Sequence, residues 1–233
     1  MQVDGSALSE FGPDIRISLG PVISFVGFRY PTRMVVIRLP DGGLFVWSPV
    51  AFSPGLRQAV DALGPVRCIV SPNKLHHLYL GAWKTAYPHA RLYASPGLRG
   101  KRKDLAFDAE LGDTTAPEWA GAIDQVAVRG SVMTEVVFFH RESRTALFAD
   151  LVQNFPPDWF GGWRGVVARL DGICAPNPGA PREWRATFVN RRAARAALAV
   201  VLAWPIERVL IAHGDPVSAE GAAFVRRAFR WLA

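Results

Sequence analysis

Three short apolar segments of this 233-residue chain end directly in side chains that can bind a metal ion. These segments and the residues that follow them are 66–70 with His76 and His77, 145–149 with Asp150, and 208–212 with His213 and Asp215. Each segment has the length and composition of a buried β-strand. In α/β proteins functional groups gather beyond the carboxyl ends of strands, on loops that a rigid frame holds. We therefore expect His77, Asp150 and His213 to converge in one site.

The rest of the pattern predicts an α/β chain with two sheets and outer helices. Strand-like runs occupy 22–28, 34–39, 44–47, 91–94, 123–128 and 135–140, beside the three above. Helical periodicity follows at 54–63, at 82–86, in a Trp- and Gly-rich segment ending near 173, at 183–203 and at 218–231. No shift in composition marks a domain boundary, so we expect a single domain over residues 1–233.

The net charge of +7 favours anionic partners in general. Basic residues cluster only at 99–103 and at Arg191, Arg192 and Arg195, and no nucleic-acid motif accompanies them. Nucleic acid is therefore an unlikely partner, and we expect a small-molecule substrate, with an anionic group as one option.

Several other features favour a reduced intracellular compartment and no membrane span. Cys68 and Cys174 lie in apolar runs typical of buried free thiols. The longest apolar stretch, 196–203, is too short to cross a bilayer. The first ten residues lack the basic and apolar regions of a signal peptide. We expect a cytoplasmic protein.

The order and spacing of the three strand-end segments resemble the metallo-β-lactamase superfamily. Residues 71–77, S-P-N-K-L-H-H, stand where that family has S/T-H-x-H-x-D-H; residues 147–150, L-F-A-D, resemble its L-F-x-G-D motif; and residues 209–215, V-L-I-A-H-G-D, are close to its closing v-l-x-G-H-G. The similarity covers nearly the whole chain. It implies a four-layered αββα sandwich with a metal site between the sheets, in a divergent, uncharacterised family of the superfamily.

The departures from those motifs affect one of the family's two metal sites. Pro72 and Lys74 replace the two histidines of H-x-H, and the family's third histidine falls near Gly130 and Ser131, where there is none. The resemblance therefore implies that this site is absent. The positions of the other site are His76, His77, Asp150 and His213. Imidazole and carboxylate together suit one zinc, iron or manganese ion.

Two functions are consistent with this degenerate site. The first is a single-metal hydrolase in which Asp150 or Asp215 orients a water molecule, with Asn73, Lys74 and Trp159 lining the pocket for substrate or anion. The alternative is a catalytically inactive, metal-free binding protein in which Lys74 replaces the lost cation and pairs with Asp150, since a buried carboxylate needs a positive partner. Two-metal nuclease chemistry is a weaker reading, because the missing histidines count against a second ion.

Overall fold

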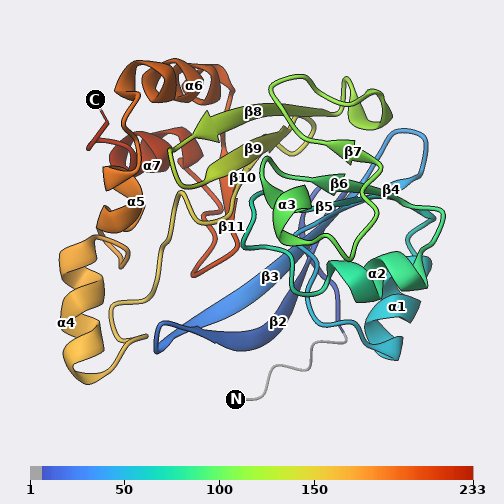
Figure 1. The fold of residues 1–233 in the computed structure, drawn as a ribbon, viewed down its shortest axis with the longest axis horizontal. Coiled ribbons are helices and arrows are strands. Elements are labelled where there is room, and N and C mark those ends of the chain that lie inside the picture. The colour runs from blue at the N-terminus through green and yellow to red at the C-terminus, as the bar shows by residue number, and fades with distance from the viewer. Residues whose placement is uncertain (1–6, 233) are drawn as a thin grey trace.

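The computed structural model describes residues 7–232; the first six residues of the N-terminal stretch considered above and residue 233 lie outside the described part. Two β-sheets form the centre of the molecule (Figure 1). The first sheet has the order β1 (Ser9–Gly12), β2 (Ile15–Phe25), β3 (Phe28–Arg38), β4 (Leu44–Trp47), β5 (Val66–Val70), β6 (Arg91–Ala94) and β7 (Ala109–Glu110). The second has the order β11 (Arg208–Ile211), β10 (Thr145–Phe148), β9 (Thr134–His140) and β8 (Ile123–Arg129).

Helices cover the outer face of each sheet. The helices of the described residues are α1 (Pro54–Asp61), α2 (Leu80–Ala86), α3 (Leu98–Lys101), the 3-10 helix η1 (Pro117–Trp119), α4 (Gly162–Asp171), α5 (Arg182–Ala186), α6 (Arg191–Ala203) and α7 (Gly221–Ala228). Figure 1 shows α1 to α3 beside the first sheet and α6 and α7 beside the second. None of the helices within residues 7–232 has the length and apolar character that a membrane span needs.

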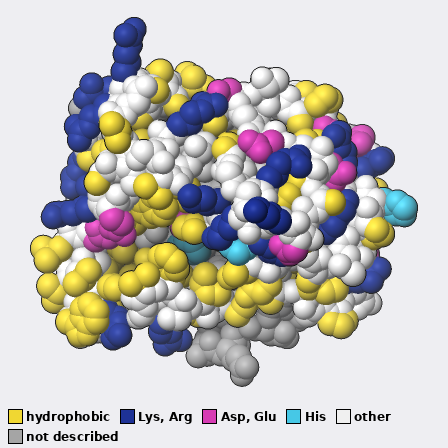
Figure 2. All heavy atoms as spheres, in the orientation of Figure 1, with side chains coloured by type: hydrophobic (Ala, Val, Ile, Leu, Met, Phe, Trp, Pro, Cys, Tyr) yellow, Lys and Arg dark blue, Asp and Glu magenta, His cyan; other side chains and the backbone are white. Residues whose placement is uncertain are grey.

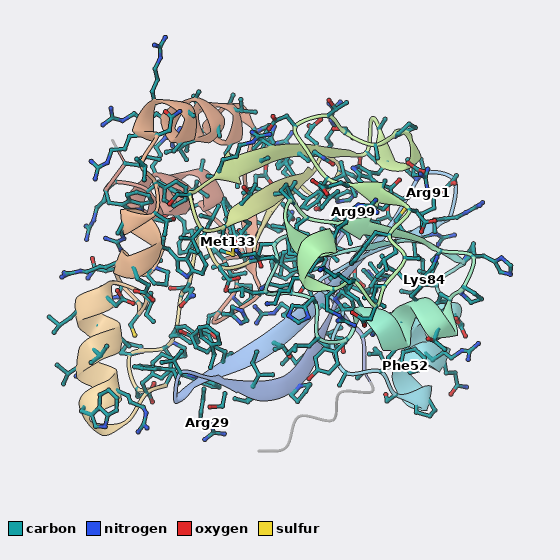
Figure 3. All side chains as sticks on the ribbon, in the orientation of Figure 1. Arg29, Phe52, Lys84, Arg91, Arg99 and Met133 are labelled. Atoms are coloured by element: carbon teal, nitrogen blue, oxygen red, sulfur yellow. The ribbon has the colours of Figure 1, made fainter. Side chains whose placement is uncertain are left out.

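The alternation of side chains along β3 shows how the layers are held together. Val35 and Ile37 pack into the apolar core between the two sheets, whereas Met34 and Val36 belong to the core between the first sheet and α1 to α3. This is the two-residue period of a strand that is buried on both faces. A third core joins the second sheet to α6 and α7. Figure 3 shows Phe52 on the α1 and α2 side, where its ring packs against Trp83 of α2. The order of layers is therefore αββα, as the sequence predicts.

Two local predictions are wrong. Segment 22–28 is not one strand, because Val26 and Gly27 form a turn between β2 and β3, both with positive φ (49° and 77°). Two successive residues with positive φ are typical of the tight hairpin turn that matches strand twist. The helix expected at 183–203 is interrupted between α5 and α6. A new helix, α6, begins after Asn190. The side chain of Asn190 accepts a hydrogen bond from the backbone N–H of Ala193 (3.0 Å) and so caps the N-terminus of α6.

The tip of the β2–β3 hairpin extends to α4, at the left of Figure 1. The Nε of Arg164 donates to the carbonyl oxygen of Gly27 (2.9 Å), and the rings of Phe28 and Trp163 meet edge to face at 5.9 Å. The hairpin and the α4–α5 region thus form a wall at the same end of the molecule as the strand ends that the next section describes.

Candidate metal centre

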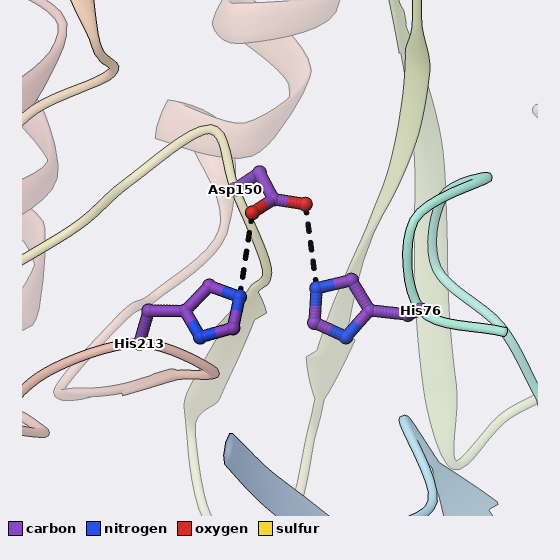
Figure 4. A group of neighbouring side chains, drawn as sticks. All are labelled: His76, Asp150 and His213. Atoms are coloured by element: carbon purple, nitrogen blue, oxygen red, sulfur yellow. Dashed lines mark ion pairs between the residues drawn. The ribbon is translucent and has the colours of Figure 1, made fainter. Parts of the chain in front are cut away.

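Parallel pairing of β10 with β11 brings Asp150 and His213 together. The register pairs Phe148 with Ile211, so both strands end at the same level of the sheet. His76 comes from the other sheet, on the turn that follows β5. Its Nε2 lies 3.3 Å from Oδ2 of Asp150, and the Nε2 of His213 lies 3.4 Å from Oδ1. Figure 4 shows the two rings on either side of the carboxylate. We call these three residues the triad.

In both histidines of the triad the second ring nitrogen, Nδ1, contacts an oxygen atom of the protein. The Nδ1 of His213 is 2.7 Å from the carbonyl oxygen of Pro31, which can only accept, so this nitrogen carries the proton. Nε2 is then the ring nitrogen that faces Asp150. The Nδ1 of His76 is 2.6 Å from the hydroxyl oxygen of Ser48. Metal-ligating histidines characteristically use the second ring nitrogen in this way, which fixes the tautomer and the orientation of the ring.

A buried arginine and a glycine shape the loop that carries His213. The Nη1 of Arg33 donates to the carbonyl oxygens of Ile211 and Gly214, the second at 2.8 Å. Gly214 has a φ of +102°, and a Cβ at this position would lie 2.2 Å from the carbonyl oxygen of Asn154, so only glycine allows this close approach. Burial lowers the pKa of Arg33 to about 10, with Asp215 acting in the opposite direction. Nothing in the sequence pattern singled out Arg33.

A second carboxylate, Glu135, lies beneath Asp150. It is fully buried and accepts hydrogen bonds from the backbone N–H groups of Ala149 (2.8 Å), Asp150 (2.7 Å) and Leu151 (3.2 Å). Burial, and then the charge of Asp150, raise the pKa of Glu135 to about 7. Glu135 was not among the site residues predicted from the sequence; the available signal was a lone acid in the apolar run 134–139 of β9.

Asn73 links these two carboxylates. Its Nδ2 donates to Oε2 of Glu135 (3.0 Å) and to Oδ2 of Asp150 (2.7 Å), and its Oδ1 accepts from the N–H of Leu75 (2.8 Å). We had expected Asn73 to line the substrate pocket. It is instead a buried residue that supports the triad through these hydrogen bonds.

The charge of Asp150 is compensated inside the triad. Burial alone would raise the pKa of this carboxyl group, but the positive charges and hydrogen bonds of His76 and His213 outweigh burial and lower it well below its usual range. Asp150 is thus an anion whose partners are two imidazole rings. The predicted pair between Lys74 and Asp150 is not formed, since the ion pairs of Asp150 within residues 7–232 go to His76 and His213.

The expected convergence of His77 with Asp150 and His213 is corrected: His76 takes that place. The turn at 73–77 sends the two neighbouring rings in different directions, and the Nδ1 of His77 lies 3.3 Å from the Nη1 of Arg102. Burial, followed by the charges of Lys101 and Arg102, lowers the pKa of His77 to about 4. His77 therefore lines the cavity in front of the triad as a neutral ring. Of the two neighbouring histidines predicted as ligands, His76 belongs to the group that could hold an ion.

Two further predicted site residues lie away from the triad. Asp215 is exposed, and its backbone, rather than its carboxylate, bonds to Asn154 (2.7 Å from N–H to carbonyl oxygen). The indole N–H of Trp159 donates to the carbonyl oxygen of Arg29 (2.9 Å), and its ring stacks on Phe155. Neither side chain borders the cavity, so their predicted catalytic and substrate-binding roles have no geometric support.

A cavity of about 250 Å³ opens in front of the triad. Its wall is largely apolar, with Lys101 and Glu183 as the charged residues besides Asp150; it is lined by Ile23, Ser24, Phe25, Tyr30, Thr32, Ser48, Pro49, Leu75, His76, His77, Leu78, Tyr79, Lys101, Asp150, Gln153, Glu183, Trp184 and His213. Figure 2 shows histidine side chains at the centre of this face, with Lys and Arg side chains next to them. An apolar hollow with a few convergent polar groups is the usual form of a small-molecule site.

The triad fits the requirements of one metal ion. Among residues 7–232, His76, Asp150 and His213 form one group whose ligand atoms all lie within 4.8 Å of one another. On a tetrahedral ion with ligand distances near 2.0–2.1 Å, neighbouring ligand atoms are about 3.4 Å apart. Each Nε2 lies at nearly this distance from one oxygen of Asp150, His76 from Oδ2 and His213 from Oδ1. Two imidazoles and one carboxylate occur in catalytic zinc sites and in non-haem iron sites, which keep further positions open.

Comparison with known proteins agrees with this fold. Residues 22–100 match a family described as a domain of unknown function, DUF4336. No curated protein sequence matches the chain. The structure of the metallo-β-lactamase DIM-1 exposed to ceftazidime superposes with a TM-score of 0.65 at 14% identity, over 97% of each chain. The metallo-β-lactamase from Pontibacter korlensis gives 0.61 at 10% identity, over 94% of this chain and 95% of that one.

A third structure shares the fold as part of a larger protein. The metal-soaked Flv1 flavodiiron core from Synechocystis sp. PCC6803 gives a TM-score of 0.66 at 12% identity, over 97% of this chain and 60% of that one. The chain therefore has the metallo-β-lactamase fold in a divergent form, with a candidate metal site of His76, Asp150 and His213.

Proposed function

We propose that this protein binds one divalent zinc, iron or manganese ion through His76, Asp150 and His213 and hydrolyses a small molecule that carries an anionic group. The observation that carries the proposal is the direction of the two rings. The Nδ1 atoms are engaged with Pro31 and Ser48, so both Nε2 atoms are turned to the same carboxylate. A bound ion would supply Lewis-acid polarisation and lower the pKa of water.

The residues around the triad support the choice of substrate. Ile23, Phe25, Leu78 and Trp184 give the cavity an apolar wall that excludes water from a bound molecule. The amine of Lys101, which also donates to the carbonyl oxygen of Lys74 (3.1 Å), stands at this cavity and can pair with an anionic group. The cationic contact that we had assigned to Lys74 is thus proposed for Lys101.

Metal content tests the first half of the proposal. Protein purified without chelators should contain about one equivalent of zinc, iron or manganese by elemental analysis. His76→Ala should lose the ion. His77→Ala should retain it, because the ring of His77 faces Arg102. Less than about a tenth of an equivalent in the wild type, even after incubation with each ion, or equal loss in both variants, would contradict the metal site.

Hydrolysis is tested separately on metal-loaded protein. A panel of carboxylate- or phosphate-bearing esters, thioesters and lactones should include a substrate whose turnover disappears in Asp150→Ala and whose KM rises in Lys101→Met. A protein that binds the ion yet turns over none of the panel would refute the hydrolase assignment alone. A metal-free protein that still binds such anions would favour the binding-protein alternative.

A further inference from the structure

Five arginines surround a second cavity, which lies between α4, α5 and α7. The cavity measures about 160 Å³ and is lined by Arg169, Leu170, Gly172, Asn177, Pro178, Arg182, Arg185, Arg227, Ala228, Arg230 and Trp231. We call it the arginine pocket. Its lining contains no aspartate, glutamate or lysine. Figure 2 shows Lys and Arg side chains gathered along the upper left edge of the molecule, where Figure 1 places α5, α6 and α7.

In the described part of the chain the arginines of the arginine pocket lack carboxylates at ion-pair distance, although the charge of Asp171 acts on Arg185. Within residues 7–232 none of its five arginines forms an ion pair with a carboxylate. Basic residues at the opposite side of the molecule behave differently (Figure 3): Arg91 pairs with Glu118, Arg99 with Glu110 at 3.7 Å, and Lys84 with Asp108 at 3.3 Å. The arginine pocket therefore gathers, in one small cavity, five cations without an ion-pair partner among the described residues.

One of the five arginines is held in place by the backbone. The Nε of Arg185 donates to the carbonyl oxygen of Ala180 (2.7 Å), and its Nη2 donates to that of Asp171 (3.3 Å). A Cβ on Gly172 or on Gly179 would come within 2.9 Å or 3.0 Å of this Nη2, so the guanidinium occupies space that two glycines leave open. Arg185 is thus prepositioned, which reduces the entropy that a ligand must remove on binding.

Helix polarity accounts for only part of this arrangement. Arg169 lies in the last turn of α4 and Arg227 in the last turn of α7, where a cation is favourable. Each helix C-terminus carries only about half a negative charge. Two such ends offset about one of the five positive charges, and Asp171, whose charge acts on Arg185, offsets part of the rest. The positive charge that remains is available to an anionic ligand.

We propose that the arginine pocket binds the phosphate or pyrophosphate group of a small molecule. All five cations are arginines, whose planar, forked donors match phosphate oxygens in pairs. A phosphate monoester carries about 1.5 to 2 negative charges at pH 7, so it balances several arginines at once, unlike a carboxylate. The cavity is smaller than the roughly 300–1,000 Å³ of sites that enclose a whole ligand. It therefore fits the charged group, with the rest of the molecule outside.

Calorimetric titration with inorganic pyrophosphate at constant ionic strength tests this site. The titrated protein carries His213→Ala and Lys101→Met, which remove the triad and the cation proposed to hold an anion beside it. Arg182→Gln/Arg227→Gln exchanges two exposed arginines of the pocket, and the matched control Arg129→Gln/Arg141→Gln exchanges two exposed arginines that pair with Asp113 and Asp124. We expect the first double variant to bind about tenfold or more weakly, because it loses charge-assisted hydrogen bonds, and the control to bind like its parent.

Three results would overturn the proposal. The first is pyrophosphate binding no tighter than chloride, and the second is equal weakening in both double variants. The third is that a short DNA duplex binds more tightly than pyrophosphate and that Arg182→Gln/Arg227→Gln abolishes this binding. That result would assign the surface to nucleic acid. Because the background lacks His213, none of these results depends on the metal centre.

Discussion

The triad and the arginine pocket handle charge in opposite ways. In the triad a buried anion is matched by two imidazoles of the same site, and Glu135 beneath it is matched by three backbone N–H groups. In the arginine pocket five cations lack a carboxylate partner in the described part of the chain. In the first arrangement the charge is matched by groups of the same site, whereas in the second it is open to an anionic ligand from outside.

The two sites meet on one short helix. Within α5, Arg182 and Arg185 border the arginine pocket, whereas Glu183 and Trp184 border the triad cavity. An anion that fixes the arginines would therefore also fix one wall of the triad cavity. The contrast between a balanced and an unbalanced site can be tested by changing the charges of each in turn.

The largest effect is expected where internal balance is removed. Glu135→Ala leaves the N–H groups of Ala149, Asp150 and Leu151 without their acceptor in a buried place. We expect the free energy of unfolding, measured by urea denaturation, to fall by about 3–5 kcal/mol, since each buried donor left without an acceptor costs about 1–3 kcal/mol. Glu110→Ala, at an exposed pair with Arg99, should cost less than about 1 kcal/mol. If Glu135→Ala lowered the free energy of unfolding as little as Glu110→Ala does, the buried hydrogen bonds of Glu135 would not stabilise this site.

A smaller effect is expected from the support behind His76. Ser48→Ala removes the partner of its Nδ1, and loss of such supports weakens metal binding about 10- to 100-fold. Ser24→Ala is a matched control, because Ser24 lines the same cavity without a hydrogen bond to either triad ring. Competition with a metal indicator gives both affinities, and equal values would show that Ser48 does not orient the ring. Pyrophosphate binding should be the same in both variants.

The sheets and strand ends could be predicted because apolar periodicity and strand length report burial directly. The segments before Asp150 and His213 were placed correctly, since parallel neighbouring strands end at one edge. The choice between His76 and His77 could not be made in this way. It depends on the backbone of the turn at 73–77, where the Oδ1 of Asn73 accepts from Leu75.

Long-range contacts explain the other omissions. Glu135 is recognisable as a support only when β9 lies beside the end of β10, and Arg33 only when β3 reaches the loop after β11. The arginine pocket combines residues 169 to 230 from three helices, so no local motif contains it. The interruption before Asn190 was missed because apolar residues continue across it, and the cap is a local hydrogen bond that periodicity does not detect.

The pH dependence of stability tests the environment of His77, which lines the cavity in front of the triad. Its pKa is lowered to about 4 in the folded protein from 6.5, first by burial and then by Lys101 and Arg102. Between pH 6.5 and 4 the unfolded chain binds a proton that the folded chain does not, so stability falls as the pH falls through this range. His77→Gln should lose less unfolding free energy between pH 7 and 5 than the wild type. Because the ring is partly exposed, solvent screening makes the difference modest; identical pH profiles would contradict the assignment.

The smallest effect is expected from relieving the unbalanced charge. Repulsion among unpaired arginines opposes folding, so Arg182→Gln/Arg227→Gln should raise the free energy of unfolding by about 0.5 kcal/mol at low salt. The gain should vanish near 1 M NaCl, where charges are screened beyond about 3 Å. Arg129→Gln/Arg141→Gln, which breaks two pairs, should give no gain at any salt concentration. A loss of stability in the first double variant would mean that these arginines stabilise the fold, and the contrast between the two sites would then concern their shape rather than their charge.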